Sequence, residues 1–207
     1  MKYSIVIPTI NRADLLREAY DDLIATGLLD ASEGLVIVDN GNQDLSFIGH
    51  PKTTIFKEPR NLGVAGSWNK GINYSFNALN ADVVIVLNDD IVLGKTPEYL
   101  QPFLQQTGNT FFVSNYYWSI YLISKNVFNT IGEFDTQFFP AYFEDNDYHH
   151  RLTKFPELSY VNTHELNPKV MRNSQTIQKD PSLNATFGDN QQKYIRKWGG
   201  TPGQETH

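Results

Sequence analysis

The stretch ADVVIVLNDDIVL, residues 81–93, decides the fold, because an apolar run in it ends abruptly at three polar residues. Val83–Leu87 are five consecutive apolar residues, a pattern typical of a strand buried on both faces of a sheet. Asn88, Asp89 and Asp90 then end the run. Strands of this kind occur in mostly parallel sheets that helices cover on both sides, so the flanking sequence should supply more strands and helices.

The sequence before this stretch supplies both. Apolar, β-branched runs predict three more strands, over 3–8, 34–41 and 53–59. Apolar residues at helical spacing predict a helix over 11–27, with Asn11 as its N-cap and Gly27 as its stop. A Gly-rich turn leads into a second helix over 61–79. Strands that alternate with helices predict a single α/β domain with right-handed crossovers and a mostly parallel sheet.

Polar residues follow three of these strands at the point where each strand ends. They are Thr9 and Asn11, then Asp39 and Asn40, then Asn88, Asp89 and Asp90. Ligands of parallel α/β sheets bind beyond the carboxyl ends of the strands. The sequence therefore predicts that these residues gather at one edge of the sheet and form a binding site.

The second half of the chain mixes acidic and aromatic residues in FFPAYFEDNDYHHRL, residues 138–152. Burial of Glu144 or Asp145 against aromatic side chains would raise its pKa toward the range useful for a general base. Aromatic faces also stack on sugar rings, so one patch can bind a sugar acceptor and deprotonate it. Asp147 is expected to cap the helix or to pair with Arg151 one turn on. The alternative is that all three acids form a solvated helix start, stabilised by the helix dipole.

Composition excludes several classes of function. The net charge is −6 with a pI of about 5.3, which argues against a protein whose main partner is nucleic acid. The chain has no cysteine, so it has no disulfide or thiolate metal site, and a reducing compartment is compatible. No apolar run approaches about 20 residues, so neither a signal peptide nor a membrane span is expected, and we predict a cytoplasmic protein.

Five motifs in order carry a resemblance to a known family. They are SIVIPTINR (4–12), VIVDNG (36–41), NLGVAGSWNKG (61–71), LNDDI (87–91) and IGEFDTQFFPAYFEDNDYHHRL (131–152). Together they resemble the inverting nucleotide-sugar glycosyltransferases of the GT-A (Rossmann-like) fold, family 2-like, over about residues 3–152. The resemblance implies transfer of a single sugar from a nucleotide sugar to a hydroxyl of a glycan or glycoconjugate, with Mn²⁺ or Mg²⁺.

The resemblance also implies roles for particular residues. Asp90 is the expected metal ligand, and His164, after a strand-like run, is a candidate second ligand. Asp39 is expected to accept from a uracil or thymine N–H, which favours a UDP- or dTDP-linked donor. The full set expected to contact the nucleotide sugar is Thr9, Asn11, Arg12, Asp39, Asn61, Gly63, Asn69 and Asp89.

On the acceptor side, Asp145 is expected to be the base, and Glu144 to orient it or to hold a hydroxyl. With one base and no second carboxylate assigned as a nucleophile, inversion is favoured over retention. Trp118 and Tyr116, with Tyr117 between them, are candidates to line the acceptor pocket; packing in the core is the alternative for them.

The chain departs from the family pattern at several points. Asn88 replaces the first acid of the Asp-x-Asp motif, and Trp68 stands where many relatives have Arg. The Gln-x-x-Arg-Trp signature of processive synthases is absent, and QKYIRKW (192–198) has a different spacing. The last departure favours transfer of single sugars over polymer synthesis.

Two other functions stay open at this point. A sugar-nucleotide nucleotidylyltransferase would carry a Gly-rich, basic loop after the first strand, whereas PTINRADLL (8–16) has one Arg and no Gly. A non-catalytic carbohydrate- or nucleotide-binding module of the same fold is favoured by Asn88 and Trp68.

The sequence also predicts how the single domain is divided. We expect a donor-binding half over 1–94, an acceptor-binding and catalytic half over 95–180, and a C-terminal tail over 181–207 that serves as a flap or linker. The polar tail suits a linker to a further module of a longer chain.

Overall fold

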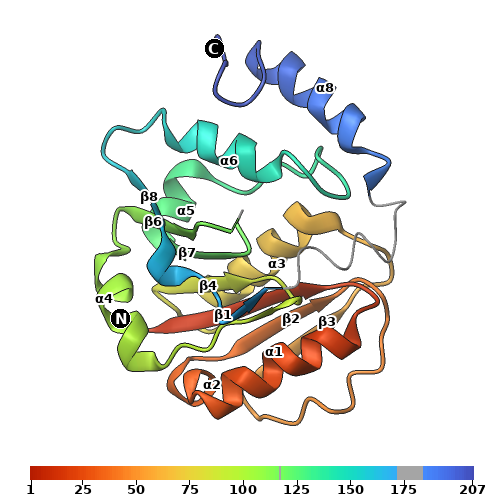
Figure 1. The fold of residues 1–207 in the computed structure, drawn as a ribbon, viewed down its shortest axis with the longest axis vertical. Coiled ribbons are helices and arrows are strands. Elements are labelled where there is room, and N and C mark those ends of the chain that lie inside the picture. The colour runs from red at the N-terminus through yellow and green to blue at the C-terminus, as the bar shows by residue number, and fades with distance from the viewer. Residues whose placement is uncertain (117, 172–183) are drawn as a thin grey trace.

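A computed structural model describes residues 1–116, 118–171 and 184–207 and centres on a seven-stranded sheet of order β3-β2-β1-β4-β7-β6-β8 (Figure 1). β7 runs antiparallel to β4 and β6, and the other strands of this sheet share one direction. The sheet is therefore mostly parallel, as the sequence predicts. Its strands are β1 (Tyr3–Thr9), β2 (Leu35–Asp39), β3 (Thr53–Lys57), β4 (Val83–Leu87), β6 (Thr110–Ser114), β7 (Ile120–Ser124) and β8 (Ser159–Thr163).

Helices cover both faces of the sheet (Figure 1). One face packs against α1 (Ala13–Ala25), α2 (Leu28–Ala31) and α4 (Pro97–Gln106). The other packs against α3 (Gly63–Asn77), α5 (Lys125–Ile131) and α6 (Glu144–Leu152). β4 shows why its sequence is continuously apolar: Ile85 lies in the first core and Val86 in the second, and both are buried. Each such side chain contributes about 1.5–3 kcal/mol on burial.

The stretch 81–93 forms two strands rather than one. β4 ends at Leu87, and β5 (Ile91–Val92) begins after the polar turn and pairs with β9 (Val170–Met171) in a second, two-stranded sheet. The 3-10 helix η1 (His164–Leu166) connects β8 toward β9. The turn formed by Asn88, Asp89 and Asp90 is thus held at both ends by hydrogen-bonded strands.

The C-terminal helix α8 (Phe187–Trp198) packs on α6 and on the segment that precedes α6 (Figure 1). Phe138, Phe143 and Tyr194 form a third, small core between them. The tail predicted as a flap or linker is therefore packed, over its described residues, against the half of the chain that carries the acidic aromatic stretch.

Two local predictions differ from the structure. The N-cap of α1 is Arg12, without a side-chain capping bond, so the predicted cap at Asn11 is wrong. Asn11 adopts a left-handed φ of 54° and its side chain packs against the loop after β2 instead. Helix α4 was not expected, because its three buried apolar residues surround an internal proline, Pro102, which weakens the helical signal. Gly27 does end α1, with φ of 75°.

Among the residues that the structure describes, no helix combines the length and the apolar character that crossing a bilayer requires.

Candidate active site

The rim of the sheet begins where β1 and β2 end side by side, with Thr9 opposite Asp39 in the strand register. Asp39 is fully buried, and its carboxylate accepts hydrogen bonds from the backbone N–H of Gly41 (2.9 Å) and of Gln43 (2.8 Å). The Gln43 amide also donates to Asp39 (3.0 Å) and to the hydroxyl of Thr9 (3.2 Å). Asp39 therefore fixes the loop that follows β2.

Asn11 and Gly41 bring the loops after β1 and β2 into direct contact. A Cβ on Gly41 would lie 2.5 Å from Oδ1 of Asn11 and 2.7 Å from its backbone N. Real side chains do not approach this closely, so only glycine fits at position 41. The left-handed backbone of Asn11, which Asn tolerates better than most residues, creates this close approach.

The turn after β4 places two buried acids on the same rim. Asp89 and Asp90 are 7% and 8% exposed. Burial, with the negative charge of Asp90, raises the pKa of Asp89 to about 7. A hydrogen bond from the Thr9 hydroxyl acts in the opposite direction and lowers this pKa. Arg12, itself buried and paired with Asp14 at 3.0 Å, adds a positive charge close to both acids.

The donor set of this turn fits a hard divalent cation. Oδ2 of Asp89 is buried without a hydrogen-bond partner, and Asp90 supplies a second carboxylate beside it. Carboxylate oxygens are the ligands that Mg²⁺ and Mn²⁺ prefer. Within residues 1–116, 118–171 and 184–207, no three His, Asp or Glu side chains gather as a complete metal site. His164 is exposed at the start of η1 and joins no such group.

The N-terminus of α3 joins the rim through Asn40. The Asn40 side chain accepts from the N–H of Leu62 (2.9 Å) and donates to the hydroxyl of Ser67 (2.8 Å). Just before α3, the Asn61 side chain accepts from the N–H of Gly63 (2.8 Å). These bonds fix the Gly-rich turn against the end of β2.

Gly63 is where the acidic aromatic segment meets this turn. A Cβ on Gly63 would lie 2.9 Å from the Phe139 ring and 2.9 Å from the carbonyl oxygen of Pro140. The next N–H along α3, that of Val64, donates to the same Pro140 carbonyl (2.8 Å). The predicted donor contact Gly63 is therefore a packing point between α3 and the segment that leads into α6.

Asn69 connects the same two parts of the chain. Its amide donates to the carbonyl of Phe134 (2.8 Å) and accepts from the Phe134 N–H (2.8 Å), and the residue is 6% exposed. The structure thus places the Asn69 amide against backbone 65 residues away. These bonds fix α3 to the segment before α6, and the predicted contact of Asn69 with the donor stays a prediction.

Glu144 and Asp145 open helix α6 in different environments. Glu144 is 5% exposed, and its Oε2 has no hydrogen-bond partner. Burial, with the neighbouring charge of Asp145, raises the pKa of Glu144 well above its ordinary value. Asp145 is partly exposed; burial raises its pKa too, but a hydrogen bond from the N–H of Asn146 (2.8 Å) favours its ionised form.

A buried polar cluster that the sequence did not reveal includes Tyr121, on which the charge of Glu144 acts. Tyr121, Tyr148 and Trp68 are each at most 3% exposed, and their hydroxyl or indole N–H groups have no hydrogen-bond partner. The rings of Trp68, Tyr121 and Tyr148 surround Phe134, at centroid distances of 5.0, 5.9 and 4.1 Å. Trp68, the departure noted in the sequence, therefore belongs to the core between the sheet and α3.

Asp147 makes the expected pair with Arg151 (2.9 Å). It is fully buried and also accepts from Lys197 (2.5 Å) and from the indole N–H of Trp198 (2.9 Å), both on α8. Three donors from two helices satisfy this carboxylate, so its role is to join α6 to α8.

The loop between β6 and β7 carries the two candidate acceptor residues. Its Ser119 carbonyl accepts from the N–H of Asn88 (3.0 Å), which holds the loop beside the acidic turn. Trp118 is 8% exposed and packs against Phe111 at a centroid distance of 4.8 Å, so the core-packing alternative describes it. Tyr116 is 40% exposed on the rim, and Tyr117 lies outside the described residues.

In Figure 1 the N-terminal end of α6 lies on the same side of the molecule as the carboxyl end of β1. The bonds through Asn40, Gly63 and Asn69 connect these two ends by way of α3. Helix α3 is thus hydrogen-bonded both to the loop after β2 and to the segment that leads into α6.

A family model for glycosyl transferase family 2 matches residues 4–160, about three quarters of the chain. The chain belongs to glycosyl transferase family 2. The match covers the acidic turn after β4 and both carboxylates at the start of α6. No curated protein matches the family 2 chain by sequence.

Solved structures similar to the family 2 chain share the GT-A fold at low sequence identity. A mannosyltransferase from Pyrobaculum calidifontis, in complex with GDP-Man and Mn²⁺, aligns at 12% identity and a TM-score of 0.68 over 98% of this chain and 66% of that one. Glucosyl-3-phosphoglycerate synthase from Mycobacterium tuberculosis, in complex with Mn²⁺, UDP and phosphoglyceric acid, aligns at 14% identity and a TM-score of 0.61 over 91% and 76%. S. aureus TarS 1-349 with UDP aligns over 79% of this chain and 61% of that one, at 11% identity and a TM-score of 0.59.

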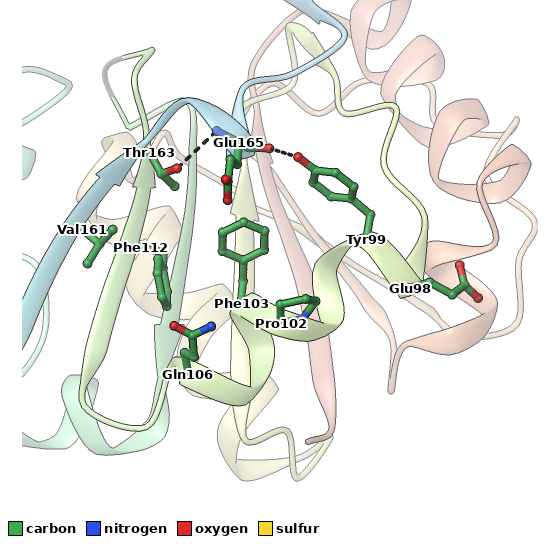
Figure 2. Close-up of a pocket in the computed structure, with 9 residues that line it drawn as sticks. All are labelled: Glu98, Tyr99, Pro102, Phe103, Gln106, Phe112, Val161, Thr163 and Glu165. Atoms are coloured by element: carbon green, nitrogen blue, oxygen red, sulfur yellow. Dashed lines mark hydrogen bonds between the residues drawn. The ribbon is translucent and has the colours of Figure 1, made fainter.

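The family 2 chain also has a cavity away from the acidic turn, between α4, β6, β8 and η1 (Figure 2). Its volume is about 480 Å³. The side chains of Phe103 and Phe112 line its centre, and Tyr99 donates to the carbonyl of Glu165 (2.9 Å) at one side. None of its lining residues is among those predicted to bind donor, metal or acceptor.

Proposed function

We propose that this chain transfers a single sugar from a nucleoside diphosphate sugar, with a UDP- or dTDP-linked donor favoured, to a hydroxyl of a glycan or glycoconjugate. The transfer depends on a divalent metal and inverts the anomeric carbon. One observation carries the proposal: a buried acid pair with an unpartnered oxygen lies at the end of β4, beside the carboxyl ends of β1 and β2. Membership in family 2 and the Mn²⁺-bound neighbours support it.

Asp89 and Asp90 would hold Mn²⁺ or Mg²⁺ together with the donor diphosphate. Bound there, the cation would neutralise charge that develops on the leaving diphosphate. Arg12 adds a fixed positive charge beside the pair. The ordered loop around Asp39 supplies directional groups for the base, and Asn11 and Asn61 border the same space.

Asp145 is the better candidate for the base of the two acids that open α6. A base must be ionised before it accepts the proton of the acceptor hydroxyl. Asp145 is the more exposed acid and its charged form accepts a backbone N–H, whereas Glu144 is buried with an unpartnered oxygen. When two carboxylates lie this close, the pair retains one proton more readily than either acid alone.

Glu144, holding that proton, can then donate a hydrogen bond to a sugar hydroxyl or to a water. Burial and the charge of Asp145 raise the pKa of Glu144 well above its ordinary value, so Glu144 would stay neutral to a higher pH than an ordinary glutamate. Exposed Tyr116 and the aromatic residues before α6 would bind the apolar faces of the acceptor sugar. With a single base and no second carboxylate placed as a nucleophile, the transfer is a single displacement with inversion.

The proposal is tested by measuring the melting temperature with UDP-, dTDP- and GDP-sugars, each with and without Mn²⁺. A ligand at 100 times its Kd stabilises the folded state by about 2.7 kcal/mol, a shift of roughly 5–10 °C for a chain of this size. We expect a metal-dependent shift with UDP- or dTDP-sugars that disappears in Asp90→Ala. Asp21→Ala, an exposed acid on α1, is the matched control and should keep the shift.

The same panel separates the competing functions. Asp145→Asn should keep the shift and lose transfer by roughly 10²–10⁴-fold, the usual contribution of a general base. If Asp90→Ala showed the same metal-dependent shift in melting temperature as the wild type, the assignment of Asp90 as a metal ligand would be wrong. A wild-type chain that binds the donor but never transfers or hydrolyses it would be a binding module, and release of diphosphate from UTP and a sugar phosphate would indicate a nucleotidylyltransferase.

A further inference from the structure

Helix α8 presents one continuous face to the segment 134–143 and to α6. Side chains at positions 190, 193, 194, 197 and 198, which share one side of a helix, make these contacts. Lys193 donates to the carbonyl of Gln137 (2.8 Å), and Lys197 binds Asp135 (2.7 Å) as well as Asp147. The helix therefore holds this segment by directed bonds at several points along its length.

Asn190 and Tyr194 are the fully buried members of this set, and Asn190 is the polar one. Its Nδ2 lies 2.8 Å from the carbonyl oxygen of Ala141, 3.2 Å from that of Phe139 and 3.5 Å from that of Tyr142. Its Oδ1 accepts from Lys193 (2.9 Å). The two N–H groups of one amide thus bind carbonyls of the turn 139–142, which Phe143 separates from the two acids.

The backbone at the end of this turn is strained. Tyr142 and Phe143 have φ of 77° and 74°, and both are large aromatic residues for which positive φ is a genuine outlier. Such a residue costs on the order of 1–3 kcal/mol and persists only where its surroundings hold it. The N–H of Asp147 donates to the Phe143 carbonyl (2.9 Å), so the first turn of α6 is built directly on the strained pair.

We propose that α8 is a positioning element for the carboxylates that open α6, and that Asn190 is the positioning residue through which it acts. Asn190 holds the turn 139–142, the turn holds Tyr142 and Phe143 in their left-handed conformations, and these direct Glu144 and Asp145 into the site. The part of the inference that concerns catalysis rests on the proposed role of Asp145 as the base.

This arrangement also sets the environment of Asp145. The ionisable groups near it are Glu144 on α6, Tyr160 on β8 and Tyr194 on α8. If the turn relaxes, water reaches the carboxylate and the effect of burial on its pKa falls. The acid limb of kcat then moves to lower pH, because a base with a lower pKa is ionised at a lower pH.

The test compares the wild-type chain with Asn190→Ala, with Lys193→Met as a milder second variant and with Gln192→Ala, an exposed position of the same helix, as the control. We expect Asn190→Ala to lower kcat by roughly 10–100-fold, since misplacement of a catalytic group by about 1 Å has such effects. The donor KM should change less than about threefold, and the acid limb should move to lower pH. Lys193→Met should act in the same direction by a smaller factor, and Gln192→Ala should match the wild type.

A second readout needs no turnover: hydrogen exchange of the Asp147 amide, which reports the bond to Phe143. Faster exchange of the Asp147 amide in Asn190→Ala supports the positioning role. If the wild-type chain shows no sugar transfer but this exchange difference is present, the proposed function fails and the positioning role stands. A different outcome is that kcat of the variants falls only in proportion to their melting temperatures, while the acid limb of the pH profile and the exchange rate of the Asp147 amide stay unchanged. In that case α8 is a stabilising helix and the inference is wrong. If Asn190→Ala does not fold, an unchanged Lys193→Met overturns it.

Discussion

At the start of α6, the adjacent acids Glu144 and Asp145 lie in different environments, which act differently on their pKa values. Glu144 lies among Tyr121, Tyr142 and Tyr148 with an unpartnered oxygen, whereas Asp145 keeps some contact with water. The folded state therefore binds a proton on Glu144 more tightly than the unfolded chain does. The stability that this proton contributes is fully present below the ordinary glutamate pKa and is lost as the pH rises through the raised pKa of the folded state.

Glu144→Gln is expected to remove that loss, because glutamine has nearly the same size and stays neutral. The variant should match the wild type near pH 4 and become more stable than it by about 1.4 kcal/mol per pH unit above the ordinary pKa, until the folded pKa is passed. Urea unfolding from pH 4 to pH 8 measures this, with Glu157→Gln, an exposed acid, as the control. A wild type and variant with parallel pH curves would contradict the burial argument.

Between elements, the fit of α3 onto the sheet depends on a residue without a side chain. A Cβ on Gly71 would lie 2.4 Å from Cγ1 of Val6 in β1, so helix and strand can pack this closely only with glycine there. The same helix carries Asn69 and begins at Gly63, which bind the segment before α6. A displacement of α3 would therefore change the positions of both the loop after β2 and the segment before α6.

Gly71→Ala is expected to destabilise the chain by about 1–3 kcal/mol, the usual cost of overpacking, in spite of the roughly 1 kcal/mol that alanine gains over glycine in a helix. Gly188→Ala in α8, where a new Cβ has no neighbour within 4 Å, is the matched control and should not destabilise. Midpoints of urea unfolding compare the two. Equal midpoints would mean that β1 and α3 can separate at little cost.

On the scale of the whole molecule, the acidic rim and the C-terminal helix are different parts of one domain. The rim is built from the carboxyl ends of β1, β2 and β4, whereas α8 contacts α6 and the segment before it. The division into a donor-binding half over 1–94, an acceptor-binding and catalytic half over 95–180 and a C-terminal tail stays a prediction.

Removal of residues 187–207 tests that division. The truncated chain would expose Phe138 and Phe143 and leave the Asp147 carboxylate without Lys197 and Trp198. We expect the metal-dependent shift with a UDP-sugar to persist and transfer to fall below detection. Calorimetry of donor binding and a transfer assay on the same preparation are the measurements. Loss of donor binding together with transfer would show that the two halves do not act separately.

Local sequence was enough to predict several features of the site. The Asp147–Arg151 pair was predictable because residues four apart are neighbours on a helix. The acids after β4 were predictable because an apolar run must end where its strand leaves the core. Neither inference needs knowledge of the rest of the chain.

Other features depend on contacts between distant parts of the chain. Asn69 binds Phe134, 65 positions away, and Lys197 binds Asp147, 50 positions away. No local sequence pattern around one partner predicts the other. Asn11 is a clear example of what local sequence cannot predict. Asn is a preferred N-cap residue, but in the structure Asn11 contacts Gly41 and does not cap α1.

The sequence by itself determined the alternation of strands and helices over about residues 3–87, the mostly parallel sheet and the acids that follow its strands, because hydrophobic periodicity and strand ends are local properties. Only the tertiary structure decided which of the acids are buried and so have raised pKa values, that Trp68 and Trp118 belong to the core, and that α8 packs against the turn before α6. Burial and pairing set those outcomes, and both depend on the side chains that the fold brings together.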